Sequence, residues 1–128
     1  MSKKSFDRPL TEVELELMQI IWGLGECTIR DVHDALPEGR DLAYTSVATM
    51  MKILEQKGVL SSHKKDRAHL FLSKVSKSDY ETLSLKHLSE NLFHGSATSM
   101  VSRLLDEGEI SQEELKSLRT LLEKRLRP

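Results

Sequence analysis

Residues 44–58 have the sequence YTSVATMMKILEQKG, and this stretch decides the fold. At about 100° per residue, its larger apolar side chains gather on one side of a helix that ends before Gly58. The opposite side carries Thr45, Thr49, Lys52 and Gln56, with Ser46 and Ala48 at its edges. The pattern therefore predicts a helix over residues 44–57 that packs through Val47, Met50, Met51 and Leu54.

The polar side of this helix has the composition that a DNA major groove accepts. Small side chains let the backbone approach, hydroxyl and amide groups can bond base edges, and lysines can reach phosphates. The only acid is Glu55, at the margin. We therefore interpret the following residues as candidate DNA contacts: Tyr44, Thr45, Ser46, Ala48, Thr49, Lys52 and Lys57.

Two other interpretations of this face stay open at the level of sequence. It can be an ordinary solvated surface, although such a helix normally alternates Glu and Lys. It can also bind another protein, in which case aromatic or large apolar side chains should stand on it. The face has none beyond Ile53 at its edge, so DNA is favoured over a protein partner.

Two helices are predicted upstream of residue 44. Thr11 and Glu14 have capping-box spacing, and the helix that they open should end at Gly23 and Gly25. Thr28 and Asp31 repeat the spacing and open a short helix to about Leu36, before the break at residues 37–39. Residues 1–8 show no period and are expected to form a loose arm.

A β-hairpin is predicted downstream, from Val59–Lys65 and His69–Val75, with Asp66-Arg67-Ala68 as its turn. The order helix, helix, helix, hairpin is that of a winged helix, which we expect over residues 1–76. The hairpin tip carries Lys64, Lys65 and Arg67, which can contact the DNA backbone or minor groove. Lysines there also protect an edge strand, and the two roles are compatible.

The remaining residues, 77–128, predict three short helices. The first follows a Ser78–Glu81 capping pair and reaches about Phe93, the second spans about Ala97–Glu107, and the third begins after Ser111. Helices of this length are marginal alone, so we expect a second copy of the chain to cover them. The expected dimerisation residues are Tyr80, Leu83, Leu88, Leu92, Met100, Val101, Leu104, Leu105, Leu115, Leu118 and Leu122. The expected fold is mainly α with a small β wing: a winged helix-turn-helix head and a three-helix dimerisation tail.

Charge and composition agree with this organisation. The 128 residues have a net charge of −1, but residues 40–77 hold eight basic and three acidic side chains, so a polyanion would meet this third of the chain. No apolar run approaches the roughly 18 residues of a membrane span, and none follows Lys3 and Lys4 as in a signal peptide. The single cysteine, Cys27, cannot form an internal disulfide, and we expect a cytoplasmic protein with no membrane partner.

Other chemistry finds little support. The five histidines have no recognised zinc spacing, and no serine lies in a nucleophile turn. Cys27 has no basic neighbour in sequence that would lower its pKa, so it is expected to be a packing residue. We expect no enzyme activity, no cofactor and no metal.

The chain resembles the penicillinase repressor family. The resemblance is carried by Leu10-Thr11 through Ile21-Trp22, by residues 44–49 running into 54–60, and by residues 110–115, and it covers about residues 8–126. It implies a winged helix dimer that binds a palindromic operator through its third helix and represses neighbouring genes.

The resemblance also implies that a regulatory metalloprotease ends repression by cutting the tail. Arg103-Leu104 stands where the better-known members carry an Asn-Phe bond, and Ala48 stands where they carry an arginine. A copper-responsive branch has clustered C-terminal cysteines, which this chain lacks because Cys27 lies in the head. Operator sequence and inducer are therefore not predicted.

Overall fold

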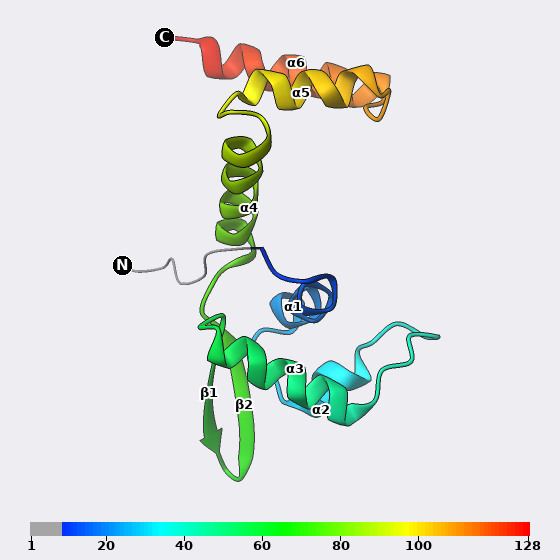
Figure 1. Ribbon diagram of the computed structural model, residues 1–128, viewed down its shortest axis with the longest axis vertical. Coiled ribbons are helices and arrows are strands. Elements are labelled where there is room, and N and C mark those ends of the chain that lie inside the picture. The colour runs from blue at the N-terminus through cyan, green and yellow to red at the C-terminus, as the bar shows by residue number, and fades with distance from the viewer. Residues whose placement is uncertain (1–8) are drawn as a thin grey trace. The chain divides into compact units, whose positions relative to one another are not determined.

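The computed structural model describes residues 9–128, so the arm predicted for residues 1–8 lies outside the described part of the chain. Contacts group the chain into two units that meet between Ser84 and Leu85. The first unit holds α1 (Glu12–Leu24), α2 (Ile29–Asp34), α3 (Tyr44–Gln56), β1 (Leu60–Lys65) and β2 (Ala68–Ser73) (Figure 1). It also includes the first half of α4 (Lys77–Leu92).

One apolar core joins the three helices and the hairpin of the first unit. The helices α1 and α3 contribute side chains at helical spacing, α2 contributes Val32, and the core members are all 1 % exposed or less: Leu17, Met18, Ile21, Cys27, Val32, Val47, Met51, Leu54, Val59, Leu60 and Phe71. Because α3 is buried through Val47, Met51 and Leu54, it is held across the unit with its other side outward. The helical patterns read from the sequence are confirmed.

The hairpin is anchored through Phe71. Cys27 and Phe71 exchange two backbone hydrogen bonds, of 3.0 and 2.7 Å, which tie the loop after α1 to β2. Burial and the nearby Asp31 raise the pKa of the Cys27 thiol to about 11, so the thiol stays protonated near neutral pH. The side chain is a small packing residue of the core, as predicted.

The structure corrects several predicted boundaries. The strands are shorter and shifted, and the turn is the two-residue Asp66-Arg67, since Ala68 already pairs with Lys65. The second helix ends at Asp34 rather than near Leu36. The first helix continues through Gly23, and only Gly25, at φ 79°, ends it. The capping boxes at Thr11 and Thr28 are confirmed.

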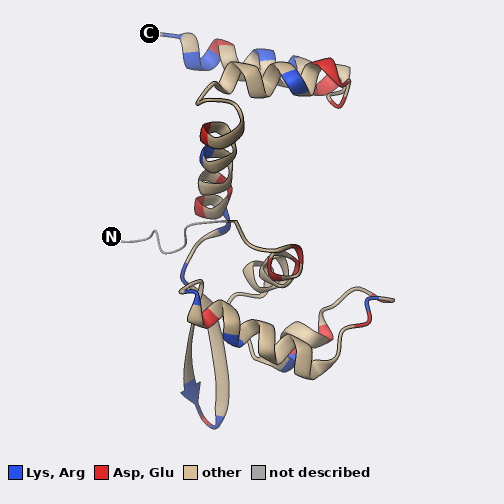
Figure 2. Ribbon diagram, viewed as in Figure 1, with Lys and Arg blue, Asp and Glu red and all other residues tan. Residues whose placement is uncertain are grey.

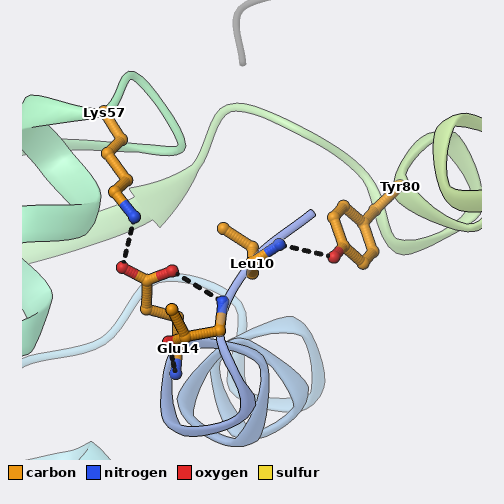
Figure 3. A network of polar contacts seen from close by, with 5 residues as sticks. Leu10, Glu14, Lys57 and Tyr80 are labelled. Carbon is orange, nitrogen blue, oxygen red and sulfur yellow. Dashed lines mark hydrogen bonds and ion pairs between the residues drawn. The ribbon is translucent and has the colours of Figure 1, made fainter. Parts of the chain in front are cut away.

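The beginning of α4 differs from the prediction in two respects. Ser76, not Ser78, caps it, because the Ser76 hydroxyl accepts from the Asp79 N–H at 3.0 Å. Tyr80 is only 7 % exposed and its hydroxyl accepts from the Leu10 N–H at 2.9 Å (Figure 3), while its ring lies 5.8 Å from that of Trp22. Tyr80 is therefore buried in the first unit, and its assignment to the dimer interface is wrong.

Trp22 connects α1 to the segment before α4. Its indole N–H donates to the Val75 carbonyl at 2.8 Å and lies 3.2 Å from the Ser73 hydroxyl. Val75 is 6 % exposed and closes this edge of the first unit. The first turn of α4 thus belongs with the head, beyond the predicted boundary at residue 76.

The second unit contains the rest of α4 together with α5 (Ala97–Asp106) and α6 (Gln112–Leu126). Ser96 and Ser111 cap α5 and α6 by accepting from the N–H groups of Ser99 and Glu114. Within residues 97–126, all of which the structure describes, no helical side chain is buried. No helix in the described residues 9–128 is long and apolar enough to cross a membrane.

A buried carboxylate links the start of α1 to the end of α3 (Figure 3). Glu14 is 2 % exposed; one of its oxygens accepts from the Thr11 N–H at 2.9 Å and the other lies 2.6 Å from the Lys57 ammonium. Burial alone would raise the pKa of Glu14, but the hydrogen bonds from Lys57 and the Thr11 backbone outweigh it and leave that pKa below its ordinary value.

This linkage predicts a specific acid sensitivity. Because the pKa of Glu14 is lowered in the folded protein, the ionised carboxylate stabilises the fold at pH values above the ordinary glutamate pKa of about 4.3. This stabilisation is lost as the pH falls through the pKa of the folded state. Lys57→Met should lower the free energy of unfolding by about 1–3 kcal/mol near pH 7, because a buried acceptor loses its charged donor. Urea unfolding followed by circular dichroism measures this.

Lys52→Met is the matched control, since Lys52 is an exposed lysine of α3 that forms no ion pair with any of the described residues 9–128. The difference in unfolding free energy between the two variants should narrow as the pH falls through the lowered pKa of Glu14, because the carboxylate then takes up a proton. Equal stability of both variants at neutral pH would show that the Glu14–Lys57 pair does not stabilise the head.

Candidate nucleic-acid interface

The outward side of α3 is the centre of the candidate interface. Tyr44, Thr45, Ser46, Thr49 and Lys52 are exposed, and Ala48 is half-buried at the edge. Glu55, the only acid in α3, accepts a 2.6 Å hydrogen bond from the Ser62 hydroxyl of β1. The exposed surface of α3 is therefore mainly polar, and its one acid is hydrogen-bonded to β1.

The segment before α3 is held by contacts that the sequence did not indicate. His33 Nε2 lies 3.0 Å from the Leu42 carbonyl, which requires the tautomer that donates from Nε2, and the His33 ring meets the Tyr44 ring edge-on at 5.8 Å. Arg40 donates twice to Glu16 of α1, at 2.7 and 3.0 Å. This bond holds the pKa of Glu16 below its ordinary value.

These contacts fix the entry of α3 in place of an end cap. Ala43 occupies the cap position and offers no side-chain hydrogen bond, unlike the Thr and Ser caps of α1 and α2 or of α5 and α6. Tyr44, predicted as a DNA contact, is 45 % exposed and its ring meets the His33 ring in an edge contact. His33, Arg40 and Glu16 are thus positioning residues that residue spacing alone could not reveal.

The hairpin tip holds the second group of predicted contacts. Lys64, Lys65 and Arg67 are all exposed there, and Figure 2 shows basic residues gathered at this end of the hairpin. Asp66 and Arg67 have φ of 50° and 71°, the signature of a type I′ turn. The middle of β1 is held by His63, whose Nε2 lies 3.0 Å from the Glu26 carboxylate.

Lys57 has a different place from the one expected. Its ammonium pairs with the buried Glu14 of α1, so the side chain is directed to α1 and not to the outward side of α3. Removing this lysine would act through stability, so we leave it out of the interface. The structure brings the α3 residues and the hairpin residues together in one unit, where β1 follows directly after the end of α3 (Figure 1).

The predicted tail residues, Tyr80 apart, lie at or near the surface of a single copy. Met100, Leu115 and Leu118 are half-buried. The others are 36–63 % exposed, namely Leu83, Leu88, Leu92, Val101, Leu104, Leu105 and Leu122. Three further exposed leucines were missing from the prediction: Leu85, Leu121 and Leu126. Arg103 and Leu104, the predicted cleavage pair, are both exposed on α5.

Comparison with known proteins now adds to this geometry. The family model described as penicillinase repressor matches residues 10–124, which is most of the chain. The chain belongs to the penicillinase repressor family. The resemblance read from the sequence is confirmed, and the match runs from the start of α1 through most of α6.

Two relatives align with the chain over most or all of their own length, and a third aligns over 46% of its length. The penicillinase repressor of Bacillus licheniformis is 27% identical over 89% of this chain and 89% of its own. The methicillin resistance regulatory protein MecI of Mammaliicoccus sciuri is 24% identical over 98% of this chain and 100% of its own. Transcriptional regulator BlaI of Mycobacterium tuberculosis is 40% identical, over 48% of this chain.

Solved structures of family members share the architecture of the first unit. The DNA-binding domain of the repressor BlaI superimposes with a TM-score of 0.51 at 28% identity, covering 62% of this chain and 94% of that domain. The monomeric form of Bacillus licheniformis BlaI, solved in complex with the blaP half-operator, gives a TM-score of 0.50 at 27% identity, covering 57% of this chain and 89% of that one. The first unit is a winged helix, as the order of elements predicted.

Proposed function

We propose that this chain is a homodimeric transcriptional repressor that binds a two-fold-symmetric DNA operator. In this proposal α3 lies in the major groove and reads bases through Thr45 and Thr49. Ser46 and Lys52 contact phosphates, and Lys64, Lys65 and Arg67 of the hairpin contact the neighbouring backbone or minor groove. No catalysis and no cofactor is part of the proposal, and its place of action is the cytoplasm of a bacterium.

The observation that carries the proposal is the composition of the outward side of α3. It presents hydroxyls and one lysine on a helix whose other side is completely buried. A protein-binding helix would present large apolar or aromatic side chains there, and this side has only Tyr44, in edge contact with His33, and the half-buried Ile53 at its margin. The relative solved with a half-operator supports one head for each half-site.

The tail supports the homodimer. Ten large apolar side chains of α4, α5 and α6 are 36–82 % exposed in a single copy. Burial of apolar surface is favourable by roughly 25 cal/mol per Å². A second copy of the chain can bury these side chains in a symmetric interface. Two joined heads would then engage two half-sites with a raised effective concentration.

The first prediction from this proposal concerns the salt dependence of DNA binding. Operator sequences are obtained by selecting bound DNA from a random pool with the full chain. The variant K64A/K65A/R67A should then bind every sequence more weakly, because these cations release counterions from phosphates. The slope of the logarithm of the binding constant against the logarithm of the salt concentration should become less steep by up to roughly 3 per head.

The matched control is K86A/K116A/R119A, which removes the same charge from α4 and α6. Titrations at several salt concentrations should leave the slope of this control unchanged. If the hairpin variant and the control have the same slope as the wild type, the hairpin does not touch the DNA backbone.

The second prediction concerns base reading. Thr45→Ala and Thr49→Ala should each reduce discrimination at particular base pairs by about 1–3 kcal/mol, since each loses a base-edge contact. Thr82→Ala, an exposed threonine of α4, is the control and should change nothing. Competition among single-base variants of the operator measures this. A uniform loss across all sequences would contradict base reading by these threonines.

The third prediction concerns the end of repression, which we propose to occur by cleavage at Arg103-Leu104. Both residues are exposed, and α5 has no buried side chain that would keep this helix from unfolding locally. Cleavage would separate α6 and weaken the dimer. A chain ending at Arg103 should therefore dimerise and bind the operator at least tenfold more weakly than the full chain.

The control for this truncation is a chain ending at Leu126, which keeps α6 whole. Sedimentation and operator titration compare the two. Full dimerisation and operator affinity in the chain that ends at Arg103 would exclude cleavage at this bond as the switch.

A further inference from the structure

Charge is separated along α6 and the turn before it. Residues 104–115 contain five acids and no base, and all five are exposed: Asp106, Glu107, Glu109, Glu113 and Glu114. At the other end, residues 120–128 contain three exposed bases, Lys124, Arg125 and Arg127, and the single acid Glu123. Figure 2 shows the acidic turn and the basic end at opposite ends of the helix. We call these the acidic turn and the basic end.

An apolar stripe runs between the two charged ends. Leu115, Leu118, Leu122 and Leu126 recur at helical spacing on one side of α6. Leu115 and Leu118 are half-buried, whereas Leu122 and Leu126 are 60 % and 82 % exposed. A partner that covers the whole stripe lies along α6 and meets both charged ends, which are about 22 Å apart along a 15-residue helix.

A symmetric partner has two ways to lie there. A two-fold axis parallel to α6 places the acidic turns of both copies together and the basic ends together, so that five acids face five acids. A two-fold axis perpendicular to α6 places each acidic turn beside the basic end of the other copy. Like charges held close are destabilising and opposite charges are favourable, so the second arrangement has the lower energy.

We propose that α6 pairs antiparallel with α6 of a second copy of this chain, through the leucine stripe, with each acidic turn facing the partner's basic end. This rests on the homodimer proposed above and specifies its pairing. Acids at the start and bases at the end of a helix also favour the helix dipole, but that effect acts within one copy and does not depend on the partner. The two effects are separable by experiment.

The test uses three variants of the full chain. One reverses the acidic turn (E107K/E109K/E113K), one reverses the basic end (K124E/R125E/R127E), and one carries both sets. Each single set makes turn and end alike in sign, so its homodimer should dissociate about tenfold or more readily than the wild type. The chain with both sets restores opposite signs and should recover most of the affinity, although its helix dipole is the least favourable.

Sedimentation at low and high salt measures the dimer constants, with circular dichroism as a check that every variant keeps its helices. The wild-type dimer should weaken at high salt, and an equal mixture of the two single-set variants should form a heterodimer. A turn variant that dimerises more tightly than the wild type, or a double variant no better than the single ones, would overturn the antiparallel pairing while leaving the homodimer intact. A wild-type chain that is monomeric at micromolar concentration would overturn both.

Discussion

The burial of Val47, Met51 and Leu54 fixes the direction in which the opposite side of α3 points. Three completely buried side chains on consecutive turns leave the helix no freedom to rotate, because turning it would expose apolar surface and open the core. The Glu14–Lys57 pair holds the far end of the same helix to α1, and His33 and Arg40 hold its approach. The candidate interface is therefore rigid through contacts made on the side away from it.

Tyr80 and Trp22 extend this rigidity into α4. The Tyr80 hydroxyl, the Trp22 indole and the Val75 carbonyl make hydrogen bonds that attach the first turn of α4 to α1. The first turn of α4 is therefore part of the head.

Local patterns in the sequence predicted most of the fold, and long-range polar contacts marked the limit of such prediction. Helical period and cap spacing are properties of neighbouring residues, so α1, α2, α3 and the hairpin could be read directly. Lys57 and Tyr80 were assigned from their chemistry and position, but their partners Glu14 and Leu10 lie 43 and 70 residues away. The outward residues of α3 were predicted correctly because burial of one side of a helix leaves the other exposed.

The type I′ turn of the hairpin has a consequence for variants selected for thermal stability. Both of its central residues, Asp66 and Arg67, adopt a backbone conformation that favours Gly and Asn over most side chains. A search for thermostable variants would therefore favour Asn-Gly at these two positions. Such a variant would gain turn stability, but it would lose Arg67, so selection for heat resistance alone would remove one of the three cations that we propose to contact DNA.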